Sequence, residues 1–278
     1  MSDMVVKRVG AIMKKELLAE QTYICEKHGS FKCRPIKVFG RIIESTCPMC
    51  DLEMEEERAI EEKKKEATAI EYAQAMRREE REKDLTEMNI GRKFWGESFE
   101  TFNAYTQNLK RYLDICVSFA NDPSGRMLLM MGKNGNGKNH LAASILKKTG
   151  GCIFSVIEIE LLLKDCYSKG TGEFDLYQRL CNTTMLIINE IGKHKSGEWE
   201  TNFLSYIINK RYENLMPTVL ITNTHLRDNC PKKGCPECLQ HYLGNDVLSR
   251  IVEDGEIMIF NEDDYRYKKR EARSGGQK

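Results

Sequence analysis

The sequence predicts an α/β fold in which helices flank a parallel sheet, preceded by a small metal-binding module and a long charged helix. Three observations lead to this fold class. Short apolar runs alternate with helix-length segments between residues 91 and 278, which is the pattern of a parallel sheet covered on both faces. Residues 1–50 hold cysteines paired at the spacing of metal ligands. Residues 51–90 contain no Gly or Pro and are dense in Glu, Lys and Arg, as in a solvated helix.

Five apolar runs are the predicted strands of the sheet. Each run is short and is bounded by segments long enough for a helix. The runs are residues 127–131, 152–156, 185–188, 218–221 and 256–260. Because a strand buried on both faces reads as a continuous apolar run, these segments indicate a sheet that is covered on both sides.

The predicted helix of residues 51–90 carries a thin apolar stripe. Its members recur at helical spacing and are Ile60, Ala67, Ile70, Ala73 and Met76. Two interpretations remain open. The stripe is a face for a partner or a weak coiled coil, or the helix is an exposed connector.

The composition excludes some classes of protein. Lys plus Arg number 43 and Asp plus Glu number 42, so no global field attracts nucleic acid, and any such contact needs a local patch. No run of about 18 apolar residues is present, so we expect no membrane span. The first residues lack the apolar stretch of a signal peptide, and we therefore expect a cytoplasmic protein.

The cysteines near the start of the chain predict a zinc site. Eleven cysteines are present, and in a reducing compartment clustered cysteines indicate metal ligands rather than disulfides. The pairs Cys25-x2-His28 and Cys47-x2-Cys50 each offer two ligands from one turn, and three thiolates with one imidazole suit tetrahedral Zn²⁺. Cys33 is an alternative to His28, which would give a four-cysteine site. A module of this size can hardly fold on its core alone, so zinc binding would supply its folding energy.

A second cysteine group lies near the end of the chain, in a predicted insertion at about residues 228–241. We expect a second Zn²⁺ to be bound by Cys230, Cys235, Cys238 and His241, with His225 as the alternative to His241. The competing interpretation is a reduced cysteine-rich loop without metal. The four scattered cysteines are predicted to be small core residues, and they are Cys116, Cys152, Cys166 and Cys181.

A phosphate-binding loop follows the first predicted strand. Residues 132–139 read Gly-Lys-Asn-Gly-Asn-Gly-Lys-Asn. The glycines let the backbone wrap a phosphate with its N–H groups, the helix that begins near Lys138 adds its positive end, and Lys138 can reach the β- and γ-phosphates. Asn139 stands where Ser or Thr normally ligates Mg²⁺. We expect the nucleotide to be bound by Gly132, Asn134, Gly135, Asn136, Gly137, Lys138, Asn139, His140 and Asn189.

Three later positions are candidates for a hydrolytic site. The run at 185–188 is followed by Asn189-Glu190, where Asp-Glu is usual; Glu190 can orient the attacking water, whereas the Asn189 amide brings no negative charge to Mg²⁺. Asn223 ends a later strand and can position water against the γ-phosphate. Arg250 can reach the nucleotide of a neighbouring subunit as an arginine finger. Taken alone, the last two would be an ordinary turn residue and a surface arginine.

In this order the motifs are similar to those of the DnaC-type replicative helicase loaders of the AAA+ superfamily. The similarity covers roughly residues 92–266 and rests on Gly-Lys-Asn-Gly-Asn-Gly-Lys-Asn-His-Leu-Ala-Ala, Ile-Ile-Asn-Glu-Ile-Gly, Ile-Thr-Asn-Thr and Leu-Gly-Asn-Asp-Val-Leu-Ser-Arg-Ile. The resemblance implies an AAA+ core, in a phage- or plasmid-encoded member that works in the host cytoplasm. It implies these roles: phosphate binding for Lys138, the catalytic glutamate for Glu190, sensor 1 for Asn223 and the arginine finger for Arg250. Asn139 is shared with the family, whereas Asn189 departs from the family's Asp.

The resemblance also implies ligands and partners. ATP or ADP with Mg²⁺ would lie between self-associated subunits, the N-terminal module would grip a hexameric DnaB-type helicase, and the ATPase unit would contact single-stranded DNA. A basic tail is a further candidate for DNA contact, or an ordinary solvated tail, and comprises Arg266, Lys268, Lys269, Arg270, Arg273 and Lys278. Two other hypotheses remain. Asn189 favours a nucleotide-sensing adaptor with little hydrolysis, and a transposition helper ATPase of the IstB type would differ only in its partner.

Overall fold

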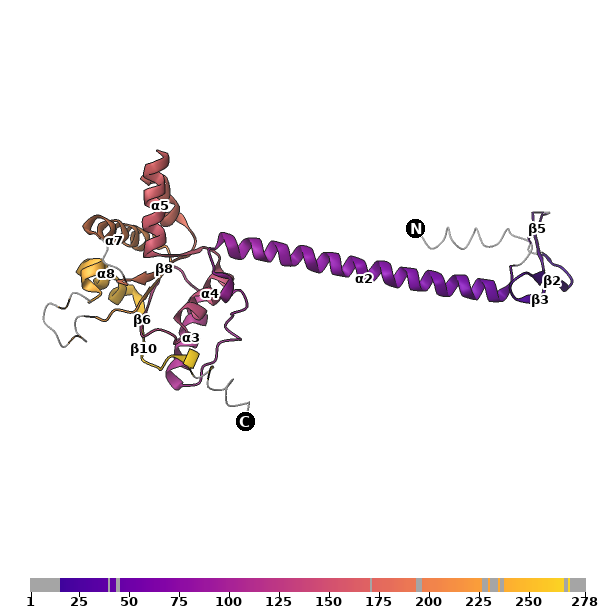
Figure 1. Cartoon of the computed structure of the whole chain (residues 1–278), viewed down its shortest axis with the longest axis horizontal. Helices are drawn as coiled ribbons and strands as arrows, with labels where there is room; N and C mark the ends of the chain where they lie inside the picture. The colour runs from indigo at the N-terminus through magenta and orange to yellow at the C-terminus, as the bar shows by residue number, and fades with distance from the viewer. Residues whose placement is uncertain are drawn as a thin grey trace, which may run out of the picture. The chain divides into compact units, whose positions relative to one another are not determined.

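A computed structural model of the 278-residue chain describes residues 16–39, 41–43, 46–170, 172–193, 197–226, 230, 235, 238–267 and 270 (Figure 1). Of the predicted basic tail, Lys268, Lys269, Arg273 and Lys278 lie outside these residues. The chain divides into two compact units, Met1–Glu79 and Glu80–Lys278. Helix α2 (Pro48–Glu87) begins in the first unit and ends in the second.

The described residues of the first unit form short antiparallel strands and very little core. Strands β1 (Glu16–Leu17), β4 (Ile36–Val38) and β5 (Arg41–Ile43) form one sheet, and strands β2 (Gln21–Cys25) and β3 (Gly29–Cys33) form a hairpin. Among the described residues of this unit, only Pro35 and Cys47 are buried. So small a core cannot offset the chain entropy of the module, which therefore needs another source of stability.

Helix α2 is the long charged helix that the sequence predicts. Pro48 occupies its first helical position, where the missing N–H is not needed, and the Thr46 hydroxyl donates to the carboxylate of Asp51 at 2.6 Å. All five positions of the apolar stripe are exposed, as a partner-binding face and a solvated connector both require. Within the part of the chain that the structure describes, no helix is both long and apolar enough to cross a bilayer.

The second unit contains the parallel sheet, and all five predicted strands are present. They are β6 (Met127–Gly132), β7 (Cys152–Ser155), β8 (Leu186–Ile191), β9 (Thr218–Thr222) and β10 (Gly255–Phe260). The sheet order is β10-β6-β9-β8-β7, and every neighbouring pair is parallel. The carboxyl ends of β6, β9 and β8 therefore lie side by side at one edge, where α/β proteins bind ligands.

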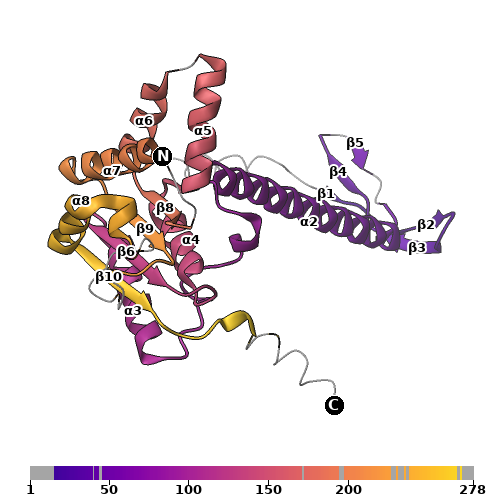
Figure 2. The same ribbon diagram turned by 60° about the vertical axis from the view of Figure 1, so that its left-hand side comes forward.

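Helices cover both faces of this sheet, as the continuous apolar runs predicted (Figures 1 and 2). They are α3 (Gln107–Asn121), α4 (Lys138–Thr149), α5 (Val156–Lys169), α6 (Glu173–Asn182), α7 (Glu198–Glu213) and α8 (Gln240–Asp254), with a short helix η1 (Arg92–Phe94) before α3. Side chains of α3, α4 and the end of α2 form the core on one face. Side chains of α5, α6, α7 and α8 form the core on the other face.

The strand boundaries differ from the predicted ones by one to three residues, and the difference at the end of β7 has a clear physical cause. Val156 was assigned to the strand that begins at Cys152, but it is the first residue of α5. The Ser155 hydroxyl accepts from the backbone N–H of Glu158, and the Glu158 carboxylate accepts from the backbone N–H of Ser155. This reciprocal cap starts the helix at once and leaves no connecting loop.

Candidate nucleotide site and metal centres

The phosphate loop connects β6 to α4 through left-handed glycines. Gly132, Gly135 and Gly137 have φ angles of 123°, 82° and 96°, a region that side chains rarely adopt. A Cβ atom on Gly132 would lie 2.1 Å from the backbone oxygen of Phe260, so the loop passes too close to β10 for a larger residue. This curvature lets successive backbone N–H groups face a phosphate.

The Lys138 ammonium lies inside the loop. Lys138 is buried, and its Nζ donates to the backbone oxygens of Gly132 at 2.7 Å and Lys133 at 2.6 Å. Burial, with a smaller contribution from Arg266, lowers the pKa of Lys138 to about 8. A phosphate in the loop would replace neutral carbonyl partners by a full negative charge, which strengthens the interaction.

Asn136 holds the loop against the sheet. Its side chain is buried, and its Nδ2 donates to the backbone oxygen of Phe260 at 3.0 Å. Its Oδ1 accepts from Lys138 Nζ at 3.2 Å. These side-chain bonds give Asn136 a positioning role in the loop, whereas Asn134 is exposed.

A cavity of about 420 Å³ borders the side chains of Asn139 and Asn189. These two residues stand at the positions that usually ligate Mg²⁺, yet both offer only neutral oxygens. Among the described residues of the lining, Glu158 is the single carboxylate, and its Oε2 accepts from the backbone N–H of Ser155 at 2.7 Å. A Mg²⁺ ion brought by a nucleotide would therefore be held mainly by phosphate oxygens and water.

Strand β8 is irregular at the predicted catalytic glutamate. The register between β8 and β9 shifts between Ile188 and Ile191, which marks a bulge at Asn189 and Glu190. Glu190 has φ 60°, and its backbone N–H donates to Asn189 Oδ1 at 2.8 Å. Its carboxylate pairs with Lys193 Nζ at 2.6 Å. A bulge and a left-handed non-glycine residue are costly features that occur preferentially at functional sites.

Asn223 directly follows β9, between the ends of β6 and β8. Its side chain is exposed at this edge of the sheet. The preceding Thr222 is buried; its hydroxyl donates to the backbone oxygen of Ile191 at 2.7 Å and accepts from the N–H of Thr224 at 3.0 Å. Thr222 thus fixes the path of the chain at Asn223 relative to the bulged end of β8.

Arg250 lies on α8 against α7. Its guanidinium is 5.2 Å from the ring centroid of Tyr212, and its Nη1 is buried without a hydrogen-bond partner among the described residues. An arginine N–H that is buried and unpaired is costly. Among the described residues, Arg250 packs on Tyr212, and no contact joins it to the phosphate loop.

The side chain of His140, one of the residues expected to bind the nucleotide, is engaged by other parts of the chain. His140 Nδ1 lies 2.7 Å from a Glu97 carboxylate oxygen, and Nε2 lies 2.7 Å from the backbone oxygen of Ser98. The imidazole also packs edge-on against Phe102. Because both ring nitrogens are engaged by the segment before α3, the side chain anchors that segment on α4, and only the backbone of His140 belongs to the loop.

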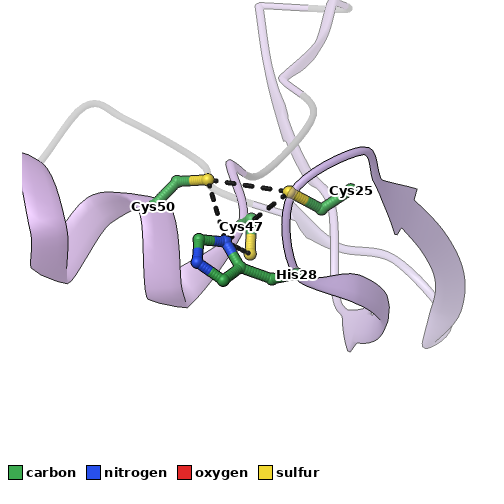
Figure 3. A group of neighbouring side chains, drawn as sticks. All are labelled: Cys25, His28, Cys47 and Cys50. Atoms are coloured by element: carbon green, nitrogen blue, oxygen red, sulfur yellow. Dashed lines mark hydrogen bonds between the residues drawn. The ribbon is translucent and has the colours of Figure 1, made fainter.

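Four predicted ligands of the N-terminal module come together (Figure 3). His28 Nδ1 lies 3.8 Å from Cys25 Sγ, 3.8 Å from Cys47 Sγ and 3.3 Å from Cys50 Sγ, and the Sγ atoms of Cys25 and Cys50 are 3.6 Å apart. Metal bonds of roughly 2.0–2.3 Å place tetrahedral ligand atoms roughly 3.5–3.8 Å apart, so these spacings fit one Zn²⁺ ion. Cys33, the alternative ligand at the end of β3, is not a member of the group.

The polar surroundings of this group also suit a metal. His28 Nε2 lies 3.1 Å from Glu53 Oε1, an arrangement in which a carboxylate orients a ligating imidazole. A hydrogen bond to the backbone N–H of His28 is the largest cause that lowers the pKa of Cys25 to about 6. The hydrogen bond with Cys25 raises the pKa of Cys50 to about 11. A divalent ion bound here would offset the negative charge of thiolates that lie close together.

The second cysteine group also comes together, with His225, the alternative ligand, in place of His241. His225, Cys230, Cys235 and Cys238 have ligand atoms within 4.8 Å of one another. His241, the predicted ligand, is not in the group: its side chain is exposed in the first turn of α8. His225 is brought in because residues 225 and 238 form a parallel bridge between the end of β9 and the start of α8.

The fold, the glycine loop and the polar ends of β8 and β9 define a P-loop ATP-binding protein of the AAA+ type. The model of the IstB-like ATP binding protein family matches residues 57–273, and the chain belongs to this family.

Relatives support the resemblance that the motifs predicted. The replicative helicase loader DnaC of Escherichia coli (strain K12) is 28% identical over 178 residues, which cover 61% of this chain and 69% of that protein. A crystal structure of the DnaC helicase loader matches with a TM-score of 0.52 and 25% identity, over 62% of this chain and all of that one. A crystal structure of DnaI, at 17% identity and TM-score 0.51, covers 63% of this chain and 96% of that one and shows the fold alone.

Two features of these sites were missed by sequence reasoning. Glu53 contacts His28 although 25 residues separate them, and nothing in the sequence marks this pairing within a helix full of glutamates. The segment after β10 contacts the phosphate loop: Tyr265 N–H donates to the backbone oxygen of Gly135 at 3.0 Å. Asp264 lies against Gly135, where a Cβ would be 1.8 Å from its carboxylate. Arg266 of this segment was considered only as a member of the basic tail, and its Nε lies 3.8 Å from Asp264 Oδ1.

Proposed function

We propose that this protein is an ATP-dependent loader that engages a hexameric DnaB-type replicative helicase and delivers it to single-stranded DNA. The observation that supports this most is the order of the site: Lys138, Glu190 and Asn223 follow or end three adjacent parallel strands of an IstB-like ATP-binding core. Relatives of this core are named replicative helicase loaders.

The site supports ATP binding and hydrolysis at a subunit interface. The loop N–H groups and Lys138 would hold the β- and γ-phosphates, and Glu190 would orient water for in-line attack. Lys193 pairs with the Glu190 carboxylate and must yield to the water for Glu190 to act. Arg250, whose Nη1 has no hydrogen-bond partner among the described residues, would supply positive charge to the nucleotide of the next subunit.

The N-terminal module is the proposed helicase-binding part. It exposes several large apolar side chains, among which Ile24 is 84% exposed and Phe39 is 80% exposed. Leu17, Ile42 and Ile43 are exposed as well. Exposed apolar side chains on a domain with almost no core of its own indicate a surface that a partner covers.

A pull-down tests the proposal. The tagged full chain should capture the host replicative helicase with ATP present, whereas a chain that begins at Glu80 should not. Substitution of Ile24 and Phe39 by serine in the full chain should weaken capture while zinc content stays the same. If the full chain captures a transposase and no helicase, the IstB-type transposition helper is the correct function.

The second candidate function is a nucleotide-sensing adaptor with little hydrolysis, which Asn189 favours because its amide brings no negative charge to Mg²⁺. ATP turnover in variants of the site distinguishes this adaptor from the loader. We expect Glu190→Gln to lower ATP turnover by roughly 100-fold or more without changing ATP affinity, because the amide cannot take up a proton from water. Asn189→Asp should raise turnover at limiting Mg²⁺, since it restores the missing charge. Turnover is measured at steady state with helicase and DNA present; Lys193→Met, which only removes the partner of the Glu190 carboxylate, should not lower it. Equal turnover in the wild type and Glu190→Gln would support the adaptor.

The zinc ion proposed for the N-terminal module leads to a second testable prediction. We expect Cys47→Ser to lower the zinc content by one ion per chain and to abolish helicase capture, while ATP affinity is unchanged. Cys33→Ser is the matched control, since Cys33 is in the same module but outside the cluster. Metal analysis of purified protein measures the zinc. An equal loss of zinc from both variants would show that the cluster of Figure 3 is not the site.

A further inference from the structure

The chain between β9 and α8 carries four metal-ligand side chains whose role the ATP site does not explain. His225 Nε2 lies 3.6 Å from Cys235 Sγ and 3.5 Å from Cys238 Sγ. Cys230 completes the group, with all four ligand atoms within 4.8 Å of one another. These spacings match the roughly 3.5–3.8 Å that separates ligand atoms of a tetrahedral zinc ion.

The group has the character of a structural metal site. Cys238 is 1% exposed and Cys235 is 8% exposed, so thiolates here would be buried without a partner cation. Four ligands of the nitrogen and sulfur type complete a tetrahedron and leave no position for water or substrate. A closed site of this composition stabilises structure and does not perform chemistry.

The backbone around the group shows what a metal would hold. The N–H of Leu239 donates to the backbone oxygen of His225 at 2.9 Å, which joins the end of β9 to the residue before α8. Leu239 is completely buried in the core that covers this face of the sheet. Helix α8 has no side-chain cap at its N-terminus, so its start depends on this junction.

We propose that His225, Cys230, Cys235 and Cys238 bind one structural zinc ion, separate from that of the N-terminal module, and that it fixes the chain between Asn223 and Arg250. The metal assignment stands on the cluster alone. The positioning role rests on the proposed function, which gives Asn223 and Arg250 their tasks. Asn223 lies two residues before the ligand His225, and Arg250 lies on the helix that starts just after Cys238.

Contacts with α7 connect the junction at Leu239 to the rest of α8, as far as Arg250. Gly244 interrupts α8 with φ 76° and ψ 167°, so the first turn and the remainder of the helix are separate segments. Ser205 of α7 donates to the backbone oxygen of Leu243 at 3.2 Å, before the interruption. Asn209 of α7 donates to Asp246 at 3.0 Å, after it. Helix α7 thus holds both segments of α8, and Arg250 of the second segment packs on Tyr212 of α7.

Zinc counting on the full chain tests the metal. We expect two zinc ions per chain in the wild type, one in His225→Ala and two in His241→Ala, the histidine that lies outside the cluster. His225→Cys should keep the second ion, because a fourth thiolate replaces the imidazole. When cobalt replaces zinc, the visible spectrum of His225→Cys should differ from that of the wild type and resemble that of a four-thiolate site. One zinc ion in the wild type, or equal zinc in His225→Ala and the wild type, would overturn the assignment.

Turnover and nucleotide affinity test the positioning role. We expect His225→Ala to lower ATP turnover by roughly 10- to 100-fold, since small displacements of catalytic groups have effects of this size. ATP affinity should stay near that of the wild type, which also shows that the ATPase unit is folded, and His225→Cys should restore turnover. Loss of zinc with unchanged turnover would refute the positioning role and leave the metal assignment intact. If the wild type shows no turnover at all, the proposed hydrolysis fails, and the positioning role fails with it.

Discussion

Replacement of Lys138 by alanine is expected to lower ATP affinity by at least roughly 100-fold, which corresponds to about 2.7 kcal/mol or more. Lys138 is the buried cation of the loop, and a phosphate there would gain a charge-assisted hydrogen bond in a poorly solvated place. The alanine variant leaves the loop carbonyls without their donor and the phosphates without a countercharge. Equilibrium binding of a fluorescent ATP analogue measures the change.

Lys133→Ala is the matched control for this prediction. Lys133 is in the same loop and carries the same charge, but its side chain is exposed, so its removal should change ATP affinity only slightly. The pH profile is a second check. Phosphates raise the pKa of Lys138 from about 8, so ATP affinity should fall as the pH rises above 8 in the wild type but not in Lys138→Ala. Equal losses of affinity in the two alanine variants would contradict the assigned role.

Local patterns in the sequence predicted the parts of this fold that depend on neighbours along the chain. The continuous apolar runs identified the strands because burial on both faces leaves that mark on each strand separately. The loop at Gly132–Asn139 was recognised because its glycines and Lys138 are adjacent in sequence. Cys25 and His28, like Cys47 and Cys50, are three residues apart, so each ligand pair is visible without knowledge of the fold.

Contacts between distant segments could not be predicted in this way. His225 and His241 are both near the second cysteine group in sequence, and only the bridge between residues 225 and 238 selects His225. The bulge at Glu190 depends on how β8 pairs with β9, which no motif specifies. His140 directly follows the phosphate loop in sequence, yet its ring nitrogens contact Glu97 and Ser98 of a preceding segment.

The same limit applies to Arg211, which the sequence shows only as one of many basic residues in helices. In the structure Arg211 is completely buried and has no carboxylate partner among the contacts of the described residues. Its Nη1 donates to the backbone oxygens of Leu180, Cys181 and Thr183 at 2.8–2.9 Å, where α6 ends. Its Nη2 donates to Pro217 and its Nε to Thr218, at the start of β9. The guanidinium therefore neutralises the negative end of α6 and joins that helix to the sheet.

Arg211→Met is accordingly expected to lower the free energy of unfolding by about 3–5 kcal/mol. Methionine fills much of the space, but the carbonyl groups of Leu180, Cys181 and Thr183 and the Thr218 hydroxyl lose a donor, and unsatisfied groups of this kind in a protein interior are costly. Burial lowers the pKa of Arg211 only to about 10, so the residue stays charged near neutral pH and the effect should not depend on pH there. Urea unfolding followed by tryptophan fluorescence measures the change in the ATPase unit, because both tryptophans, Trp95 and Trp199, lie in that unit.

Arg126 is the matched control, because it makes the same kind of contact in a solvated setting. Its Nη2 donates to the backbone oxygens of Ser118 and Asp122 at the end of α3, and its guanidinium lies 5.6 Å from the ring centroid of Phe119. Because Arg126 is only partly buried, water can replace its hydrogen bonds, and Arg126→Met should cost about 1 kcal/mol or less. The difference in the free energy of unfolding between the two variants isolates the cost of leaving helix-end carbonyl groups without a hydrogen-bond donor or water. A loss below about 1 kcal/mol for Arg211→Met would mean that water or a shifted side chain reaches those carbonyls.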